Sequence, residues 1–143
     1  MFVKLQTPEQ RLSSWREIRQ KSHNSIQEVI DDFSSIKYES RYLDYYTPKS
    51  WPNAFDIVSE GYLCQSGVTL ILASTLIYKG FLFEEDILYP VISNNISGNS
   101  GLVILHGNTV YNFLQDKITT WDYVKDNATV FQIHNLQNIK SLS

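Results

Sequence analysis

Cysteine is almost absent from this chain of 143 residues, which holds a single thiol, Cys64. One cysteine excludes an intramolecular disulfide and any zinc site built from several cysteines. Charge is also scarce, because Asp, Glu, Lys and Arg make up 19% of the residues and the formal net charge is −3. A protein that holds a phosphate backbone needs clustered Lys and Arg side chains, so we do not expect a nucleic acid partner.

The sequence also lacks an apolar run long enough to cross a membrane. The longest run, residues 68–77, is about half of what a transmembrane helix needs. Residues 1–6 show no basic region followed by an apolar stretch, so no secretory signal is visible. These absences predict a cytoplasmic protein without membrane contact.

Motifs of common enzyme classes are missing. The chain has no glycine-rich phosphate loop, no His-Glu-x-x-His and no nucleophile elbow. We therefore expect no cofactor and no metal site, and we favour a protein that is not an enzyme.

Hydrophobic residues make up 43% of the chain and aromatic residues 13%, which is ample material for a packed core. The length is usual for one domain, and neither a linker nor a repeat divides the sequence. We expect a single domain over residues 1–143.

The first half carries helical spacing and capping signals. Residues 7–10 (TPEQ) and 25–28 (SIQE) form capping boxes, and the second of these opens a helix that ends near Phe33. A short helical turn is expected over residues 55–58. Apolar residues then spread around a longer helix, from about 62 to 78, which predicts a central helix covered on several sides.

The apolar rhythm changes near residue 81. Short β-branched or aromatic runs predict four strands, at residues 87–92, 101–106, 109–114 and 128–134. Gly107-Asn108 suits a two-residue turn, so the second and third strands should pair antiparallel. A threonine-capped helix of one or two turns is expected near residues 119–124. The predicted fold class is α+β, with N-terminal helices packed on a C-terminal antiparallel sheet of about four strands.

Residues 34–53 form a connector that is rich in aromatic residues. Such residues commonly close the rim of a core, and they are also favoured anchors in protein interfaces and can stack on unpaired bases. Because the chain has few charges and many Tyr, Asn and Ser residues, protein recognition is the better of the two binding interpretations. The candidate binding residues are Tyr42, Tyr45, Tyr46 and Trp51.

Histidines and carboxylates offer weaker candidates. Neither His106 nor His134 is followed two positions later by Thr or Ser, as a two-histidine phosphoesterase requires. Strand alternation places His134 opposite Phe131 and Ile133, which predicts an exposed imidazole. The carboxylate runs 31–32 and 84–86 predict solvated charge, because adjacent residues diverge on helices and strands.

Cys64 lies in a helical, apolar context without a histidine nearby in the sequence. A cysteine in such surroundings usually behaves as a small buried hydrophobe. Nothing in the sequence predicts an activated thiolate.

Several stretches resemble a group of small uncharacterised proteins of tailed bacteriophages. They lie within about residues 12–80 and comprise residues 14–18, 42–46 and 50–57, followed by Cys64 and Thr75-Leu76. The resemblance implies a bacteriophage context and a place in the host cytoplasm or the virion. It implies no activity.

We therefore predict a non-enzymatic phage protein, either a virion or assembly component or a small accessory factor. Its partner would be another protein, of the host or of the phage, bound through the aromatic surface, and self-association is left open. The alternative is a small enzyme acting on nucleotides or nucleic acid. In that alternative His106, His134 and a carboxylate from residues 84–86 converge near the sheet.

Overall fold

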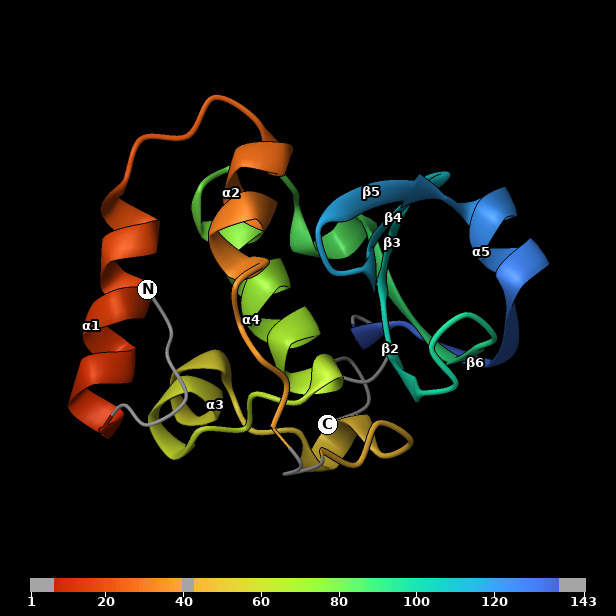
Figure 1. Ribbon diagram of the computed structural model, residues 1–143, viewed down its shortest axis with the longest axis horizontal. Helices are drawn as coiled ribbons and strands as arrows, with labels where there is room; N and C mark the ends of the chain where they lie inside the picture. The colour runs from red at the N-terminus through yellow and green to blue at the C-terminus, as the bar shows by residue number, and fades with distance from the viewer. Residues whose placement is uncertain (1–6, 40–42, 137–143) are drawn as a thin grey trace.

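The computed structural model describes residues 7–39 and 43–136 (Figure 1). Residues 1–6, on which the expectation about a secretory signal rests, lie outside the described part. The predicted α+β class is confirmed, since most helices lie in the first half and an antiparallel sheet in the second.

The first two helices begin where the capping boxes predict. α1 (Pro8–Gln20) starts after Thr7, whose hydroxyl accepts the Gln10 N–H at 3.2 Å while the Gln10 side chain accepts the Thr7 N–H at 2.9 Å. α2 (Ile26–Phe33) is capped by the Ser25 hydroxyl. Both helices satisfy part of their free N-terminal N–H groups locally, which is why these signals are readable in the sequence.

The predicted central helix is α4 (Gln65–Tyr78). It starts later than expected, because Cys64 takes the N-cap position, and a separate short helix, α3 (Ala54–Glu60), precedes it. α3 ends at Gly61, whose φ of 75° suits glycine. Figure 1 shows α4 between the other long helices and the sheet, and it contacts α2, α3, β2 and β4.

The sheet has six antiparallel strands among the described residues, against about four expected. They are β1 (Ile87–Asn94), β2 (Ser100–Leu102), β3 (Ile104–His106), β4 (Thr109–Leu114), β5 (Lys117–Thr120) and β6 (Ala128–His134). Hydrogen bonds link the strands in the order β2-β1-β3-β4-β5. Outside this order, β6 also pairs with β1. The expected strand 101–106 is divided at Val103, and β5 was missed because most of its residues are exposed.

The predicted hairpin between β3 and β4 is confirmed. His106 pairs with Thr109 in antiparallel register, so Gly107 and Asn108 form a two-residue turn. Gly107 has a φ of 60°, which glycine adopts without strain. α5 (Trp121–Asn127) is the predicted short helix, and Thr120 caps it. Two 3₁₀ turns, η1 (Pro48–Ser50) and η2 (Glu84–Asp86), complete the elements.

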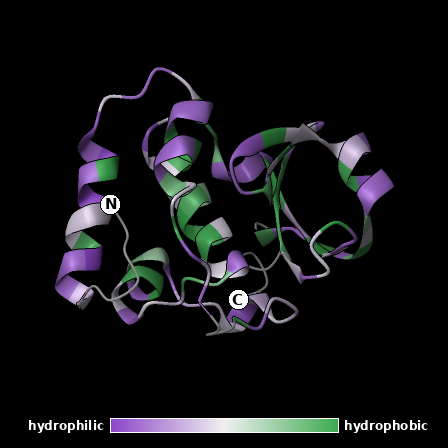
Figure 2. Ribbon diagram, in the orientation of Figure 1, coloured by the Kyte–Doolittle hydropathy of each residue, from purple (hydrophilic) through white to green (hydrophobic). Residues whose placement is uncertain are grey.

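Apolar side chains cover both faces of the sheet. One core joins α1–α4 to the strands, and a smaller core lies between the opposite face and α5. Figure 2 shows hydrophobic residues gathered along α4 and the strands that face it. Within the described ranges, no helix has both the length and the hydropathy that a membrane crossing requires.

Candidate functional site

A groove of about 450 Å³ lies where the connector meets α4 and β1. We call it the aromatic groove. Its lining residues come from the connector, from α3 and α4, from η2 and β1, and from the segment after β6: Pro48, Trp51, Pro52, Asn53, Ala54, Leu70, Ser74, Ile77, Glu84, Tyr89 and Leu136.

One stripe of α4 supplies part of the groove. Leu70, Ser74 and Ile77 are spaced four and three residues apart, so they share a side of the helix. All three are only half-buried, whereas Ile71, Leu72 and most other residues of α4 are buried. The expectation that α4 is covered on several sides holds, apart from this stripe.

Trp51 forms a fixed wall of the groove. Its Nε1 donates to the carbonyl oxygen of Asp44 at 2.7 Å. Its ring meets the rings of Tyr89 and His134 edge-on, at centroid distances of 6.0 and 5.5 Å. The hydrogen bond of the indole N–H and the packing against these two rings together hold Trp51 in place.

The four candidate aromatic residues have different environments. Trp51 and Tyr45 are half-buried and pack against the main core, so they close its rim, while Trp51 also faces the aromatic groove. Tyr46 is 49% exposed, and its ring lies 5.0 Å from that of Tyr45. Tyr42 lies outside the described residues.

The lining of the groove includes a negative charge. Among the described residues that line it, Glu84 is the one charged residue. Burial raises the pKa of Tyr89 far above its ordinary value, and the nearby Glu84 carboxylate raises it further. The phenol of Tyr89 therefore stays neutral and available as a hydrogen-bond donor at physiological pH.

The predicted exposure of His134 is wrong. The imidazole is buried, at 5% exposure, whereas Phe131 and Ile133 are 53% and 45% exposed. His134 pairs with Tyr89, whose side chain is itself in the core, so alternation places His134 on the core side. The error arose from assigning the apolar residues of an outer strand to the core face, although nothing in the described structure covers them.

No hydrogen bond or ion pair among the described residues joins the residues of the enzymatic alternative, although His106 pairs with Ile87, which follows residues 84–86. His134 bonds to the carbonyl oxygen of Tyr45. Among the described residues, no hydrogen bond or ion pair joins His106 or His134 to a carboxylate of residues 84–86 or to each other. Nor does any group of three or more His, Cys, Asp or Glu side chains in that part of the chain form a metal-binding arrangement.

Cys64 is buried, at 5% exposure, as expected. Its Sγ accepts the Gly67 N–H at 3.4 Å and so caps α4. That capping role was missed, because cysteine is not among the preferred N-cap residues.

A network of polar side chains, which begins at Gln65 next to Cys64, connects α4 to the sheet. The Gln65 Nε2 donates to the carbonyl oxygen of Asn112 at 3.1 Å, and the Asn112 Nδ2 donates to the Thr69 hydroxyl at 2.8 Å. Tyr38 donates its hydroxyl to the Asn112 Oδ1 at 3.1 Å. Asn112 has a φ of 66°, which asparagine tolerates better than most residues.

Two further cavities, of about 250 and 280 Å³, flank this network. They share Tyr38, Gln65, Asn99 and Ser100 as lining residues. The polar side chains of the network already bond to one another, so they leave a ligand few hydrogen-bond partners. The aromatic groove, in contrast, offers a ligand apolar surface.

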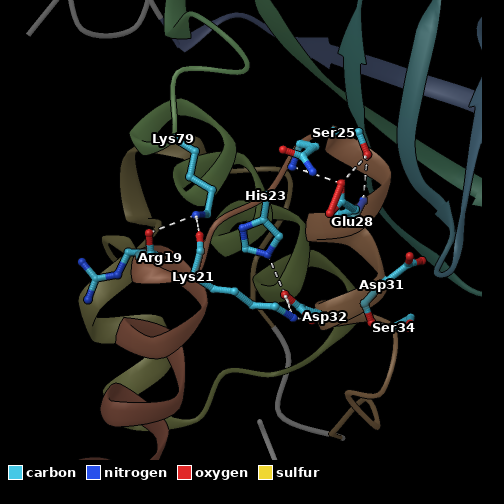
Figure 3. Close-up of polar contacts among 10 residues, drawn as sticks. Arg19, Lys21, His23, Ser25, Glu28, Asp31, Asp32, Ser34 and Lys79 are labelled. Atoms are coloured by element: carbon cyan, nitrogen blue, oxygen red, sulfur yellow. Dashed lines mark hydrogen bonds and ion pairs between the residues drawn. The ribbon is translucent and has the colours of Figure 1, made fainter.

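A charged cluster at the ends of α1 and α2 was missed by the sequence analysis (Figure 3). His23, with a side chain only 1% exposed, places its Nε2 2.6 Å from the Asp32 Oδ2, and Lys21 lies 3.0 Å from the other oxygen. The Lys79 ammonium donates to the carbonyl oxygens of Arg19 and Lys21, at 3.0 and 2.6 Å. The cluster joins α1, α2 and α4.

The expectation of solvated charge at residues 31–32 is therefore half wrong. Asp31 is exposed, but only 14% of the Asp32 side chain is exposed. Burial raises the pKa of Asp32, yet the hydrogen bonds from His23 and Lys21 outweigh it and the pKa is lowered overall. Adjacent side chains diverge on a helix, so one carboxylate of the pair turns inward.

Comparison with known proteins adds a fold relationship. No protein-family model matches the chain, and no curated protein matches it in sequence. The calcium-bound structure of LapG from Legionella pneumophila is similar, with a TM-score of 0.65 and 12% identity, over 92% of this chain and 78% of LapG. An EGTA-treated structure of LapG gives the same TM-score and identity, over 90% and 74% of the two chains. At this identity the likeness shows a shared fold and nothing more specific.

Proposed function

We propose that this protein acts by binding and not by catalysis, and that it recognises a segment of another protein in the aromatic groove. The observation that carries the proposal is the half-buried stripe of α4. Leu70 and Ile77 stay half-buried beside the fixed ring of Trp51. Covering such apolar surface gains about 25 cal/mol per Å² removed from water, and a rigid wall loses little entropy on binding.

A protein partner fits this site because the aromatic surface continues beyond the groove. Trp51 contacts His134, His134 bonds to Tyr45, and Tyr45 packs against Tyr46, which is 49% exposed. Rigid Trp and Tyr anchors surrounded by polar groups are typical of protein interfaces. A small molecule in the groove would leave Tyr46 uncovered.

The enzymatic alternative has less support. Its candidate residues His106 and His134 share no partner, and the one cysteine, Cys64, accepts a backbone N–H and has no bond to a histidine in the described structure. The similar LapG structure contains calcium, which is a property of LapG. Without a metal-binding group in the described ranges, we carry no calcium site over to this chain.

The bacteriophage origin stays a prediction from residues 12–80. A virion or assembly component and a small accessory factor both agree with a binding groove. The partner is accordingly a protein of the phage or of its host.

The test blocks the groove by enlarging one small residue of its lining. Ser74→Trp places a large ring within the groove, and Ser13→Trp places the same ring on the exposed surface of α1 as the matched control. Partners are captured from lysate of cells that make the protein, identified, purified and measured for affinity by titration calorimetry. Circular dichroism and urea unfolding check that both variants fold.

We expect Ser74→Trp to weaken binding of the purified partner at least about 10-fold, the size typical of losing a well-buried contact, and Ser13→Trp to leave it unchanged. Equal affinity of both variants would remove the aromatic groove as the binding site. Measurable turnover of a nucleotide by the wild-type protein would favour the enzymatic alternative.

A further inference from the structure

The chain arrives at the aromatic groove through β6. His134, the last residue of β6, lies 2.8 Å from the carbonyl oxygen of Tyr45 and meets the ring of Trp51 edge-on. Two residues later, Leu136 is half-buried, packs against the main core and lines the groove. Leu136 is also the last residue that the structure describes. The covalent chain that follows Leu136 therefore starts at the groove.

The sequence after Leu136 is long enough to cross the groove. An extended chain advances about 3.3–3.6 Å per residue, and a cube of 450 Å³ is only about 8 Å on a side. About three residues therefore suffice, and the sequence continues through residues 137–143.

The chemistry of these residues matches the floor of the groove. Residues 137–143 read QNIKSLS, and apolar residues recur at every third position from Leu136, at Ile139 and at Leu142. A spacing of three places side chains on one side of a segment with three residues per turn, such as polyproline II. The floor that α4 contributes, Leu70 and Ile77, is apolar and half-buried. The row of apolar residues thus begins with a residue that already belongs to the lining.

We propose that residues 137–143 are an internal ligand of the aromatic groove, and that the partner segment has to displace them. Ile139 covers the stripe formed by Leu70 and Ile77, next to Leu136. This inference rests on the proposed function, because it assigns a regulator to the same groove.

Tethering favours this occupant over a free one. A segment from another molecule loses translational and rotational freedom when it binds, whereas a segment attached at Leu136 has already lost most of it. A short connection gives an effective concentration in the millimolar range, so a segment with an intrinsic dissociation constant of some hundreds of micromolar is bound most of the time. A competing partner then loses affinity by about 3- to 10-fold.

The experiment measures how fast a thiol placed in the groove reacts with N-ethylmaleimide. Ser74→Cys supplies this thiol in the full-length protein, and Ser13→Cys supplies an exposed thiol on α1 as the reference. The unsubstituted protein gives the background rate of Cys64, which is buried.

Each thiol variant is made with three versions of residues 137–143. The first version is unchanged, and the second carries Ile139→Ser with Leu142→Ser, which removes the apolar side chains. The third version carries Asn138→Ser with Lys140→Ser and is the matched control, because it changes two polar residues of the same segment. Circular dichroism checks that all variants fold.

We expect Ile139→Ser with Leu142→Ser to speed the labelling of Ser74→Cys about 3- to 10-fold and to leave Ser13→Cys unchanged. The matched control should leave both rates unchanged. A synthetic peptide of residues 136–143, added at millimolar concentration, should slow the labelling again, and the same peptide with both serines should not. The affinity of the partner purified in the preceding test should tighten by the same factor.

The inference and the proposed function fail differently. If the labelling rate of Ser74→Cys is the same with all versions of residues 137–143, the inference is overturned and the groove stays available to its partner. Protection that increases with protein concentration would assign the covering segment to a second copy of the chain, which also overturns the inference. Faster labelling with an unchanged partner affinity would keep the segment in the groove and place the partner elsewhere, which contradicts the proposed function.

Discussion

The imidazole of His134 holds the aromatic connector by its backbone, since its Nε2 lies 2.8 Å from the carbonyl oxygen of Tyr45, 89 residues away in the sequence. A carbonyl oxygen only accepts hydrogen bonds, so Nε2 carries the proton and donates it. The same ring meets Trp51 edge-on. The last strand of the sheet therefore positions one wall of the aromatic groove.

Replacing His134 by Phe keeps an aromatic ring beside Trp51 but removes the donor to Tyr45. We expect the free energy of unfolding to fall by about 1–2 kcal/mol, because the carbonyl group loses its partner in a mostly buried position. Urea unfolding followed by circular dichroism measures the change. The control is His106→Phe, whose imidazole is half-buried and has no hydrogen bond in the described structure. Equal losses in both variants would show that the bond to Tyr45 contributes nothing.

Asp32 should make the free energy of unfolding fall at acidic pH. Its pKa is lowered in the folded protein, where burial is outweighed by hydrogen bonds from His23 and Lys21. The contribution is fully present above the unfolded value of 3.8 and is lost as the pH falls through the lower folded value. Urea midpoints measured from neutral pH down to about pH 2 should thus fall more steeply for wild type than for Asp32→Asn.

At neutral pH, Asp32→Asn should cost about 1–3 kcal/mol, because two cationic or polar donors lose a charged acceptor. Asp31→Asn is the matched control on the neighbouring, exposed residue. A pH profile of Asp32→Asn that overlies the wild-type profile would refute this role for Asp32.

The phenol of Tyr38 should titrate at a higher pH than an exposed tyrosine. Burial raises the pKa of Tyr38 to about 12, because its hydroxyl lies in the polar network beside Asn112 although 40% of the residue is exposed. A raised pKa favours the protonated folded form, so the contribution is present below the unfolded value of 10.0 and is lost as the pH rises towards 12. Ultraviolet titration of wild type and Tyr38→Phe should differ by one phenol near the upper value. If the phenol that Tyr38→Phe removes titrates near pH 10.0 in the wild type, the burial of this hydroxyl is contradicted.

Replacing Gly101 by alanine should destabilise the protein. A Cβ at position 101 would lie 2.0 Å from the Gln65 Oε1 and 3.0 Å from the Ser66 Oγ. Gly101→Ala must displace the Gln65 side chain from its bonds to the carbonyl oxygens of Leu102 and Asn112, so we expect a loss of about 1–3 kcal/mol in urea unfolding. In a Gln65→Ala background the same substitution should cost less, because the clash is gone. Additive losses would show that the two residues do not compete for space.

The aromatic groove was only partly foreseeable. Of the candidates that the sequence singled out, Trp51 lines the groove and Tyr45 and Tyr46 do not, while Leu70, Ser74, Ile77 and Tyr89 were missed. A stripe at helical spacing looks the same whether a neighbour covers it or not. Only the tertiary packing around α4 leaves this one half-buried.

The charged cluster around His23 shows the same limit. His23 lies in the loop before α2 and Asp32 lies near the end of α2, so their contact depends on how that loop runs beside the helix. Neither residue type nor spacing encodes that path. The reversed exposure of β6 has a related cause, because alternation predicts that neighbouring residues face opposite sides and not which side is covered.

What the sequence by itself determined was local: the capped starts of α1 and α2, the hairpin at Gly107-Asn108 and the change from helical to strand spacing. Each of these depends on hydrogen bonds or dihedral angles within a few residues, which the residue types there control. Tertiary structure alone decided that β6 adds to β1, that Asp32 turns inward and that the groove stays open beside Trp51. Those outcomes depend on which distant surfaces meet, and burial between such surfaces is a property of the whole packed chain.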